Sequence, residues 1–238
     1  MLSPDLWFDR CWNFDDELGE VNLNDSFNCI KPDGTFISDL WSKVPISFYL
    51  GHKFSLFQAL DKDKHSYNYI DKNGNFLFDT WFDRCYITLN DYGFVALDDK
   101  YNYIKPDGTF LSDVWFDWCE EFNEGFSVVK LNGKCNYVAF GGGFLSEQWF
   151  DSCYRFYDGF GVVKLNSKYN YIKPDGTFLS ERWLDGCLKF SGGFGMVVLD
   201  YKFNYIKSDG QFLSKIWFDE CEPFFSKRFS RVEYLGAC

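Results

Sequence analysis

Cysteine is the residue with the most evident chemical potential in this chain, because it recurs in one sequence context. Six of the nine cysteines follow the pattern Trp-Phe-Asp-x-Cys or a close variant. Stacked thiols could bind a soft metal or form disulfides, but a metal site needs several ligands that converge on one ion. Ligands a whole repeat apart converge poorly, so we expect small, buried, reduced side chains. The six are Cys11, Cys85, Cys119, Cys153, Cys187 and Cys221.

An aspartate two residues before each of these cysteines offers a second candidate chemistry. Repeated carboxylates could form a ring for Ca²⁺ or perform acid–base catalysis. Catalytic carboxylate pairs need different environments, however, whereas these copies are equivalent. An aspartate at a turn commonly accepts backbone N–H groups two or three residues further on, so we expect turn capping. The series is Asp9, Asp83, Asp117, Asp151, Asp185 and Asp219.

The remaining candidates stand outside the repeated patterns. His52 and His65 are the two histidines of the chain, and no Cys-x-x-Cys pair accompanies them, so the usual zinc spacing is missing. We find no serine elbow and no phosphate-binding glycine loop in the sequence. Trp12 and Trp118 lie outside the tryptophan register described below and could expose their rings as stacking platforms. These four residues are the binding candidates, and we expect no catalytic residue, metal site or cofactor.

Charge and hydropathy restrict the classes of partner. The formal net charge is −11 without a basic run, which disfavours binding to nucleic acid through phosphate contacts. No stretch approaches the ~18 apolar residues of a membrane span. The first residues lack the basic and apolar regions of a signal peptide. We therefore expect a cytoplasmic protein whose partner is another protein, with no nucleic acid and no membrane; the sequence leaves the oligomeric state open.

Tryptophan gives the register of an internal repeat. Seven tryptophans are 34 residues apart, except for one interval of 40 residues. Such a period indicates a repeat architecture in which neighbouring units share a core. We expect one repeat domain over residues 1–238, with a partial repeat at its end. The repeats begin near Trp7, Trp41, Trp81, Trp115, Trp149, Trp183 and Trp217.

The sequence pattern of each repeat predicts about three antiparallel strands. The segment 160–165 and its counterparts are β-branched and short, and the segment 168–172 after a tight turn is aromatic and β-branched. Lys-Pro-Asp-Gly then forms a turn, because proline fixes φ and glycine supplies a positive φ. The segment after this turn, as in 109–112, predicts the third strand. We find no useful helical periodicity.

Three residue types hardly vary between the repeats. The turn glycine indicates a backbone with positive φ, and the phenylalanine two residues later is expected in the core. An asparagine is fixed inside the aromatic strand. We interpret it as a left-handed residue at a bulge, with a row of ligand-binding amides as the alternative. The glycines are Gly34, Gly74, Gly108, Gly142, Gly176 and Gly210; the phenylalanines are Phe36, Phe76, Phe110, Phe144, Phe178 and Phe212; the asparagines are Asn28, Asn68, Asn102, Asn136, Asn170 and Asn204.

The second repeat is irregular. It is six residues longer than the others and has a longer hairpin around residues 61–65. Insertions in repeat proteins map to loops on one face, which is sometimes the binding face. The alternative is neutral growth of a loop, since loops tolerate insertion at little cost.

The repeat resembles the WG (KWG) repeat of bacterial and phage-associated proteins. The resemblance rests on the Phe-Asp-x-Cys of 116–119, the Phe-x-x-Gly-Phe of 122–126, the Val-Val-Lys strand, the Lys-Tyr-Asn-Tyr-Ile of 100–104 and the Asp-Gly turn. It extends from Trp7 to about Leu235. The chain has Tyr-Asn or Phe-Asn where the family usually has Trp-Gly, and Cys where it usually has Ala. The resemblance implies a repeat-built binding or scaffold module without common catalytic residues.

Two arrangements of the repeats are compatible with the sequence. We expect an all-β fold of antiparallel β-meander repeats stacked as an open solenoid, with a closed propeller-like ring as the alternative. Aromatic residues make up 22% of the chain, and most recur in every repeat as expected core. The function that we expect is a non-enzymatic scaffold for protein–protein interaction. The alternative is a small-ligand or glycan-binding module that uses exposed aromatic residues.

Overall fold

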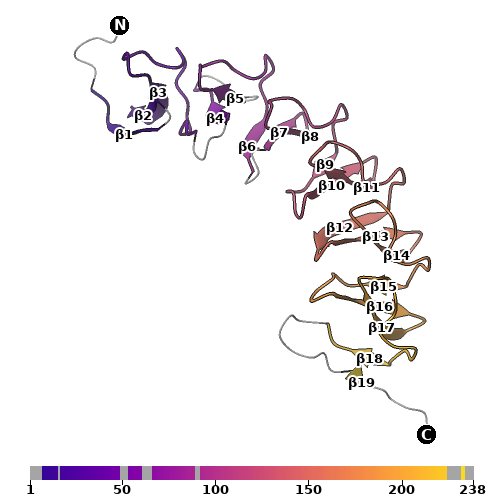
Figure 1. Cartoon of the computed structure of the whole chain (residues 1–238). Helices are drawn as coiled ribbons and strands as arrows, with labels where there is room; N and C mark the ends of the chain where they lie inside the picture. Colours follow the sequence, from indigo (N-terminus) through magenta and orange to yellow (C-terminus); the bar gives the residue numbers. More distant parts are fainter. Residues whose placement is uncertain are drawn as a thin grey trace. The chain divides into compact units, whose positions relative to one another are not determined.

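The computed structural model describes residues 7–15, 17–48, 53–60, 66–88, 92–223 and 232–233. The chain divides into two compact units, Met1–Trp115 and Phe116–Cys238, which we call unit 1 and unit 2. Within the described residues all regular structure is β-strand, which confirms the predicted all-β fold (Figure 1). The prediction of one domain over the whole chain stays a prediction.

Unit 1 contains three small antiparallel sheets. Their strand orders are β1-β2-β3, β4-β5 and β6-β7-β8. Each sheet follows the previous one along the chain, and none of the three closes on itself. The strands are β1 (Arg10–Asp15), β2 (Leu18–Leu23), β3 (Ser26–Ile30), β4 (Phe54–Gln58), β5 (Tyr67–Asp71), β6 (Arg84–Ile87), β7 (Gly93–Leu97) and β8 (Lys100–Ile104).

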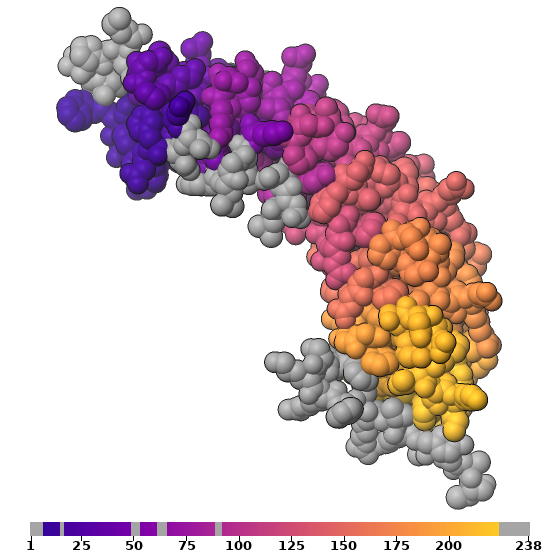
Figure 2. Space-filling model, viewed as in Figure 1, coloured from indigo at the N-terminus to yellow at the C-terminus, as the bar shows by residue number. Residues whose placement is uncertain are grey.

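Unit 2 repeats the same pattern. Three sheets have three strands each, and the last sheet has two described strands. The side chains of successive repeats contact one another along this unit (Figure 2). The strands are β9 (Trp118–Cys119), β10 (Phe126–Leu131), β11 (Lys134–Ala139), β12 (Ser152–Tyr157), β13 (Phe160–Leu165), β14 (Lys168–Ile172), β15 (Gly186–Cys187), β16 (Phe194–Leu199), β17 (Lys202–Lys207), β18 (Glu220–Cys221) and β19 (Val232–Glu233).

The predicted meander is confirmed, but its first strand differs from the prediction. The segment with the cysteine supplies the first strand, and the two predicted strands form the hairpin that follows. The segment after the Asp-Gly turn makes single β-bridges instead of a strand, such as Ile172 with Phe178. Leu184 then exchanges two backbone hydrogen bonds of 2.8 and 2.9 Å with Tyr169. The loop is thereby fastened to β14 before the next sheet begins.

The glycine of the Asp-Gly turn has the conformation that the sequence predicts. All six recurrent glycines have φ between 81° and 94°. The backbone N–H of Gly210 donates to the carbonyl of Lys207 at 2.9 Å and closes the turn. A β-carbon on Gly210 would lie 2.5 Å from the carbonyl oxygen of Leu179 in the preceding repeat. The absent side chain therefore also allows adjacent repeats to approach each other.

The interpretation of the recurrent asparagines as left-handed residues is wrong. Asn170 lies in β14 without a positive φ and is fully buried. Its Nδ2 donates to the carbonyl of Ser180 at 2.7 Å, and its Oδ1 accepts the N–H of Tyr171 at 2.8 Å. The amide thus pairs buried backbone groups of the loop, as buried polar groups require. Positive φ occurs instead at the hairpin tip, at Asn166 and Ser167.

The core lies between consecutive sheets. Tyr137 of β11 is fully buried, and its hydroxyl oxygen lies 2.6 Å from the carbonyl oxygen of Tyr154 and 3.0 Å from that of Val162. Both carbonyls belong to the next sheet. The ring of Phe156 crosses the Tyr137 ring edge-on at 5.0 Å between centroids. One aromatic side chain therefore supplies both apolar contact and a hydrogen bond between repeats.

The phenylalanines that follow the turn glycines are not fully buried, although Phe76, Phe110, Phe178 and Phe212 pack against the core from its edge. They are half-buried, and Phe144 is 40% exposed. Each one packs against the tryptophan five residues later, at which the next repeat begins, as Phe178 does against Trp183 with ring centroids 5.1 Å apart. These pairs cover the rim of the core, because the segment after the turn lies outside the sheet. Most of the buried aromatic residues come instead from the strands, and three more, Phe82, Phe116 and Phe150, directly follow a tryptophan.

Candidate functional site

The recurrent cysteines lie on the first strand of every sheet except β4-β5. Cys85 and Cys119 are buried, Cys153, Cys187 and Cys221 are partly exposed, and Cys11 is exposed. Burial raises the pKa of the Cys85 thiol above its ordinary range. In the described part of the chain, no group of three or more Cys, His, Asp or Glu residues could hold a metal ion. Core packing therefore accounts for Cys85 and Cys119, and Cys153 and Cys187 pack against the core from its edge, whereas Cys11 is exposed, in contrast to the prediction.

The recurrent aspartates cap turns, but not the predicted ones. Asp151 accepts the backbone N–H of Asn166 at 2.7 Å, at the tip of the hairpin fifteen residues further on. The Lys134 ammonium of the preceding repeat pairs with the same carboxylate. Lys134 and the Asn166 N–H together lower the pKa of Asp151. Asp9, Asp83, Asp117 and Asp185 make the same bond to Asn24, Asp98, Asn132 and Asp200.

Two of the four single candidates, Trp12 and Trp118, lie among the described residues. Trp12, in β1, is 42% exposed, with its ring centroid 6.3 Å from that of Phe27. Trp118, in β9, is 48% exposed. The two tryptophans belong to different units. His52 and His65 lie outside the described residues.

An exposed aromatic surface forms around β12, and the sequence reasoning missed it. Tyr154 is 50% exposed and Tyr157 is 39% exposed. Residues three apart on a regular strand point to opposite faces, but the pairing of β12 with β13 shifts register between these two tyrosines. Such a bulge re-aims side chains. It leaves both tyrosines exposed while Phe156 between them is buried.

A groove of about 450 Å³ runs between β12 and the start of the next repeat. Val162 and Cys187 also line it, and its surface is mainly apolar. Gly186 leaves space at a position where the other repeats carry Arg10, Arg84, Trp118, Ser152 and Glu220. This glycine is the sequence signal that could have located the groove. We define the tyrosine groove by Tyr154, Tyr157, Tyr169, Gly186, Leu188 and Lys189.

Charged groups rim the tyrosine groove. Lys189 Nζ lies 4.9 Å from the centroid of the Tyr157 ring, within cation–π distance. Arg155 Nε is 2.9 Å from Glu120 Oε2 in the preceding repeat, so this cation is already paired. Asp185 pairs with Lys168 and accepts the N–H of Asp200. Lys189 is therefore the rim charge without a carboxylate partner among the described residues.

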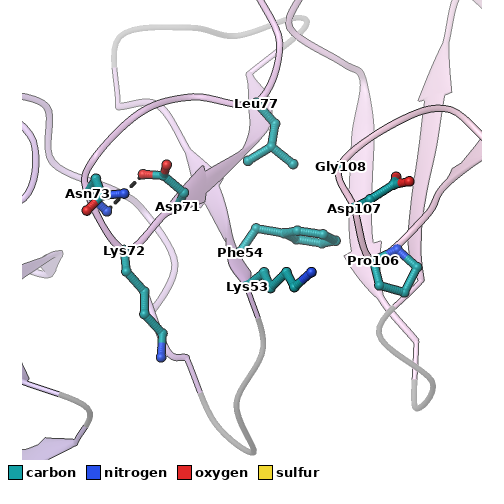
Figure 3. Close-up of a pocket in the computed structure, with 9 residues that line it drawn as sticks. All are labelled: Lys53, Phe54, Asp71, Lys72, Asn73, Leu77, Pro106, Asp107 and Gly108. Carbon is teal, nitrogen blue, oxygen red and sulfur yellow. Dashed lines mark hydrogen bonds between the residues drawn. The ribbon is translucent and has the colours of Figure 1, made fainter.

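A second pocket, of about 440 Å³, lies in unit 1 beside the irregular repeat. Lys53 and the ring of Phe54 extend from the start of β4 toward the turn at 106–108, whereas Lys72 points away from that turn (Figure 3). Two hydrogen bonds from Thr109 lower the pKa of Asp107, and Lys53 adds a smaller electrostatic contribution. The pocket thus combines both charge signs with a buried apolar ring.

Comparison with known families is decisive for the repeat type. The description "WG containing repeat" applies to a family model that matches residues 103–135 and 150–169. Residues 103–135 and 150–169 therefore match the WG repeat, which confirms the resemblance found in the sequence. The second matched stretch includes all of β12 and β13, so one wall of the tyrosine groove is itself a WG repeat.

Structural and sequence comparisons add no further identification. The Kluyveromyces lactis protein titled "KlHsv2 with loop 6CD replaced by a Gly-Ser linker" is similar at 14% identity and a TM-score of 0.36, over 83% of this chain and 76% of that one. Citrobacter koseri AztD is similar at 9% identity and a TM-score of 0.31, over 86% and 70%. TM-scores this low support no conclusion about this chain. No curated protein matches the sequence.

The described residues also bear on the membrane prediction. None of them forms a helix that is long and apolar enough to cross a membrane.

Proposed function

We propose that this WG repeat protein is a non-enzymatic scaffold that binds another protein through the tyrosine groove. The observation that carries the proposal is the exposure of Tyr154, Tyr157 and Leu188 around one groove with cationic groups at its rim. Tyrosine and arginine are enriched in protein interfaces, and hot-spot residues cluster in pockets of this kind. Repeat proteins also commonly present extended binding surfaces.

The repeated polar groups support a non-enzymatic role. Nucleophilic catalysis by cysteine requires the thiolate, whereas burial raises the pKa of the Cys85 and Cys187 thiols. The recurrent carboxylates hold hairpin tips and lysines of neighbouring repeats, as Asp151 does. Both the cysteines and the aspartates therefore have structural roles that recur in successive repeats. The proposal does not extend to nucleic acid or membrane partners, and it keeps the expected cytoplasmic location.

Site-specific crosslinking tests this function. Tyr154 of the full chain is replaced by photoreactive p-benzoylphenylalanine, with the same replacement at Tyr201 as the matched control. Tyr201 is 93% exposed at a hairpin tip outside the groove. After irradiation in an extract of the source organism, we expect a discrete protein adduct from position 154 only.

Binding by the purified partner completes this test. The protein identified in the adduct is purified, and its affinity is measured for the parent chain, Tyr154→Ala and Tyr201→Ala. We expect a loss of affinity of about tenfold or more for Tyr154→Ala alone, the magnitude typical of an interface hot spot. Equal adducts at both positions, no adduct at position 154, or equal affinities would refute the proposed function.

Small-ligand binding is the second candidate function, and the pocket of Figure 3 favours it. Its volume of about 440 Å³ lies in the range of ligand sites. Lys53 and Asp107 could orient a ligand that carries both charge signs. Calorimetric titration with pooled amino acids and oligosaccharides tests this alternative. We expect heat that Lys53→Ala abolishes, with Lys215→Ala as the control; heat that persists in Lys53→Ala would contradict it.

A further inference from the structure

The shape of the tyrosine groove suits a short segment of an extended chain. One wall is β12 with its register shift, and the other is the segment 185–189 of the next repeat. Gly186 places no side chain in the second wall, and a β-carbon added there would lie 3.3 Å from Val198, its pairing partner between β15 and β16. Tyr154 and Leu188, which follow the cysteine of consecutive repeats, expose apolar surface on opposite sides. An apolar side chain inserted between them would bury that surface.

The tyrosine groove has more cations than anions, whereas the chain as a whole has a negative net charge. The chain has a net charge of −11, yet two cations and one anion line the groove. The anion, Asp185, is paired with Lys168, while no carboxylate of the described residues pairs with Lys189. Lys164 contributes a further ammonium, 5.3 Å from the centroid of the Tyr169 ring. The groove therefore presents positive charge directly beside apolar rings.

We propose that the occupant of the tyrosine groove is an acidic-hydrophobic peptide segment of the partner protein. An apolar side chain of this segment lies between Tyr154 and Leu188, and a neighbouring carboxylate pairs with the Lys189 ammonium. This inference rests on the proposed function and adds the chemistry of the partner. A neutral glycan would leave the Lys189 charge uncompensated, and a second copy of this acidic chain would be repelled over the rest of its surface.

Designed peptides test the inference on the full chain. The probe is a fluorescein-labelled peptide that alternates glutamate with leucine or phenylalanine, and its binding is followed by fluorescence anisotropy. Three matched peptides carry glutamine for glutamate, lysine for glutamate, or serine for the apolar residues. We expect the acidic-hydrophobic peptide to bind at least about tenfold more tightly than each of the three, and this preference to weaken as salt is raised.

Variants locate the binding in the groove. Lys189→Glu and Tyr154→Ala are each expected to weaken binding of the acidic-hydrophobic peptide by about tenfold. Lys215→Glu and Tyr201→Ala change exposed residues of the same types elsewhere in unit 2 and should leave it unchanged. Gly186→Trp, which places at the groove the residue found at position 118, should block binding. Circular dichroism of each variant verifies that it is folded.

Several outcomes would overturn the inference. Equal binding of the glutamate, glutamine and lysine peptides would refute the role of charge, and unchanged binding by Lys189→Glu and Tyr154→Ala would refute the location. Stronger binding of neutral oligosaccharides, or self-association in sedimentation that Lys189→Glu removes, would assign the groove to another occupant. If the crosslink at position 154 identifies a protein partner while the peptides show no charge preference, the proposed function stands and this inference fails.

Discussion

The hydroxyl oxygen of Tyr137 lies 2.7 Å from the point that a β-carbon on Gly161 would occupy. Tyr137 belongs to one sheet and Gly161 to the next, and the same hydroxyl contacts two carbonyl oxygens of that next sheet. Gly161, which directly precedes Val162 and Val163, thus makes room for the tyrosine that joins the repeats. Gly93 stands in the same relation to Tyr69, also at 2.7 Å.

Replacing this glycine should therefore destabilise unit 2. We expect Gly161→Ala to lower the free energy of unfolding by about 1–3 kcal/mol, the usual cost of overpacking a core. Gly141→Ala is the matched control, because nothing lies within 4 Å of its added β-carbon. Urea denaturation followed by tryptophan fluorescence gives the comparison. Equal midpoints for the two variants would show that the Tyr137 contact adapts without cost.

The buried asparagines should be sensitive to loss of their amide. Asn170→Ala removes the Nδ2 donor to Ser180 and the Oδ1 acceptor for Tyr171. We expect a loss of about 1–3 kcal/mol of unfolding free energy, because both backbone groups lose a buried partner. Asn166→Gly, at a hairpin tip with φ of 49°, should stay within about 1 kcal/mol of the parent. The reverse order in urea denaturation would contradict the assigned role of Asn170.

The bridging aspartates should make stability fall in acid. Lys134 and the Asn166 N–H hold the pKa of Asp151 below its ordinary value of 3.8. A lowered pKa in the folded state means that Asp151 stabilises the fold above pH 3.8 and loses this effect as the pH falls through the folded-state value. We expect Asp151→Asn and Lys134→Ala each to flatten the decline of urea midpoints between pH 5 and pH 2. An unchanged decline in both variants would contradict the linkage.

The cysteines should differ strongly in reactivity. Burial raises the pKa of Cys29 to about 12, with a smaller contribution from Glu20, and burial also raises the pKa of Cys85. Cys11 is exposed. Because the thiolate is the reactive form, we expect Cys11→Ser to remove one equivalent of the fast phase of Ellman's reaction at about pH 8. Cys29→Ser and Cys85→Ser should leave the fast phase unchanged, and its loss in either variant would refute the assignment.

Two phenylalanines should have unequal effects on stability. Phe190 is 2% exposed and stacks on Phe160 of the preceding repeat with centroids 4.0 Å apart. We expect Phe190→Ala to cost about 3–5 kcal/mol of unfolding free energy. Phe144→Ala, at an exposed position after a turn glycine, should cost clearly less. Comparable urea midpoints for both variants would restore the prediction that the phenylalanines after the turns belong to the core.

Periodicity was enough to predict the repeat, the all-β class, the hairpins and the glycine turns. The Gly-x-Phe spacing and the Val-Val-Lys runs are local signals, and positive φ at Gly176 follows from four consecutive residues. The fixed asparagines were misread because their partners lie outside the strand. Asn170 bonds a carbonyl ten residues away, across a loop. A polar residue fixed in a strand indicates a buried partner but does not name it.

The candidate site also combines features that the sequence predicts with features that only the tertiary structure shows. By itself, the sequence determined the repeat unit, the series of cysteines and aspartates and the exposed character of Trp12 and Trp118, since each depends on residue type and spacing. Only the tertiary structure decided that Tyr154 and Tyr157 share one groove with Lys189. That result depends on a register shift in β12, on the missing side chain of Gly186 and on the packing of one repeat against the next. Contacts between repeats are set by three-dimensional fit, which a one-dimensional period does not encode.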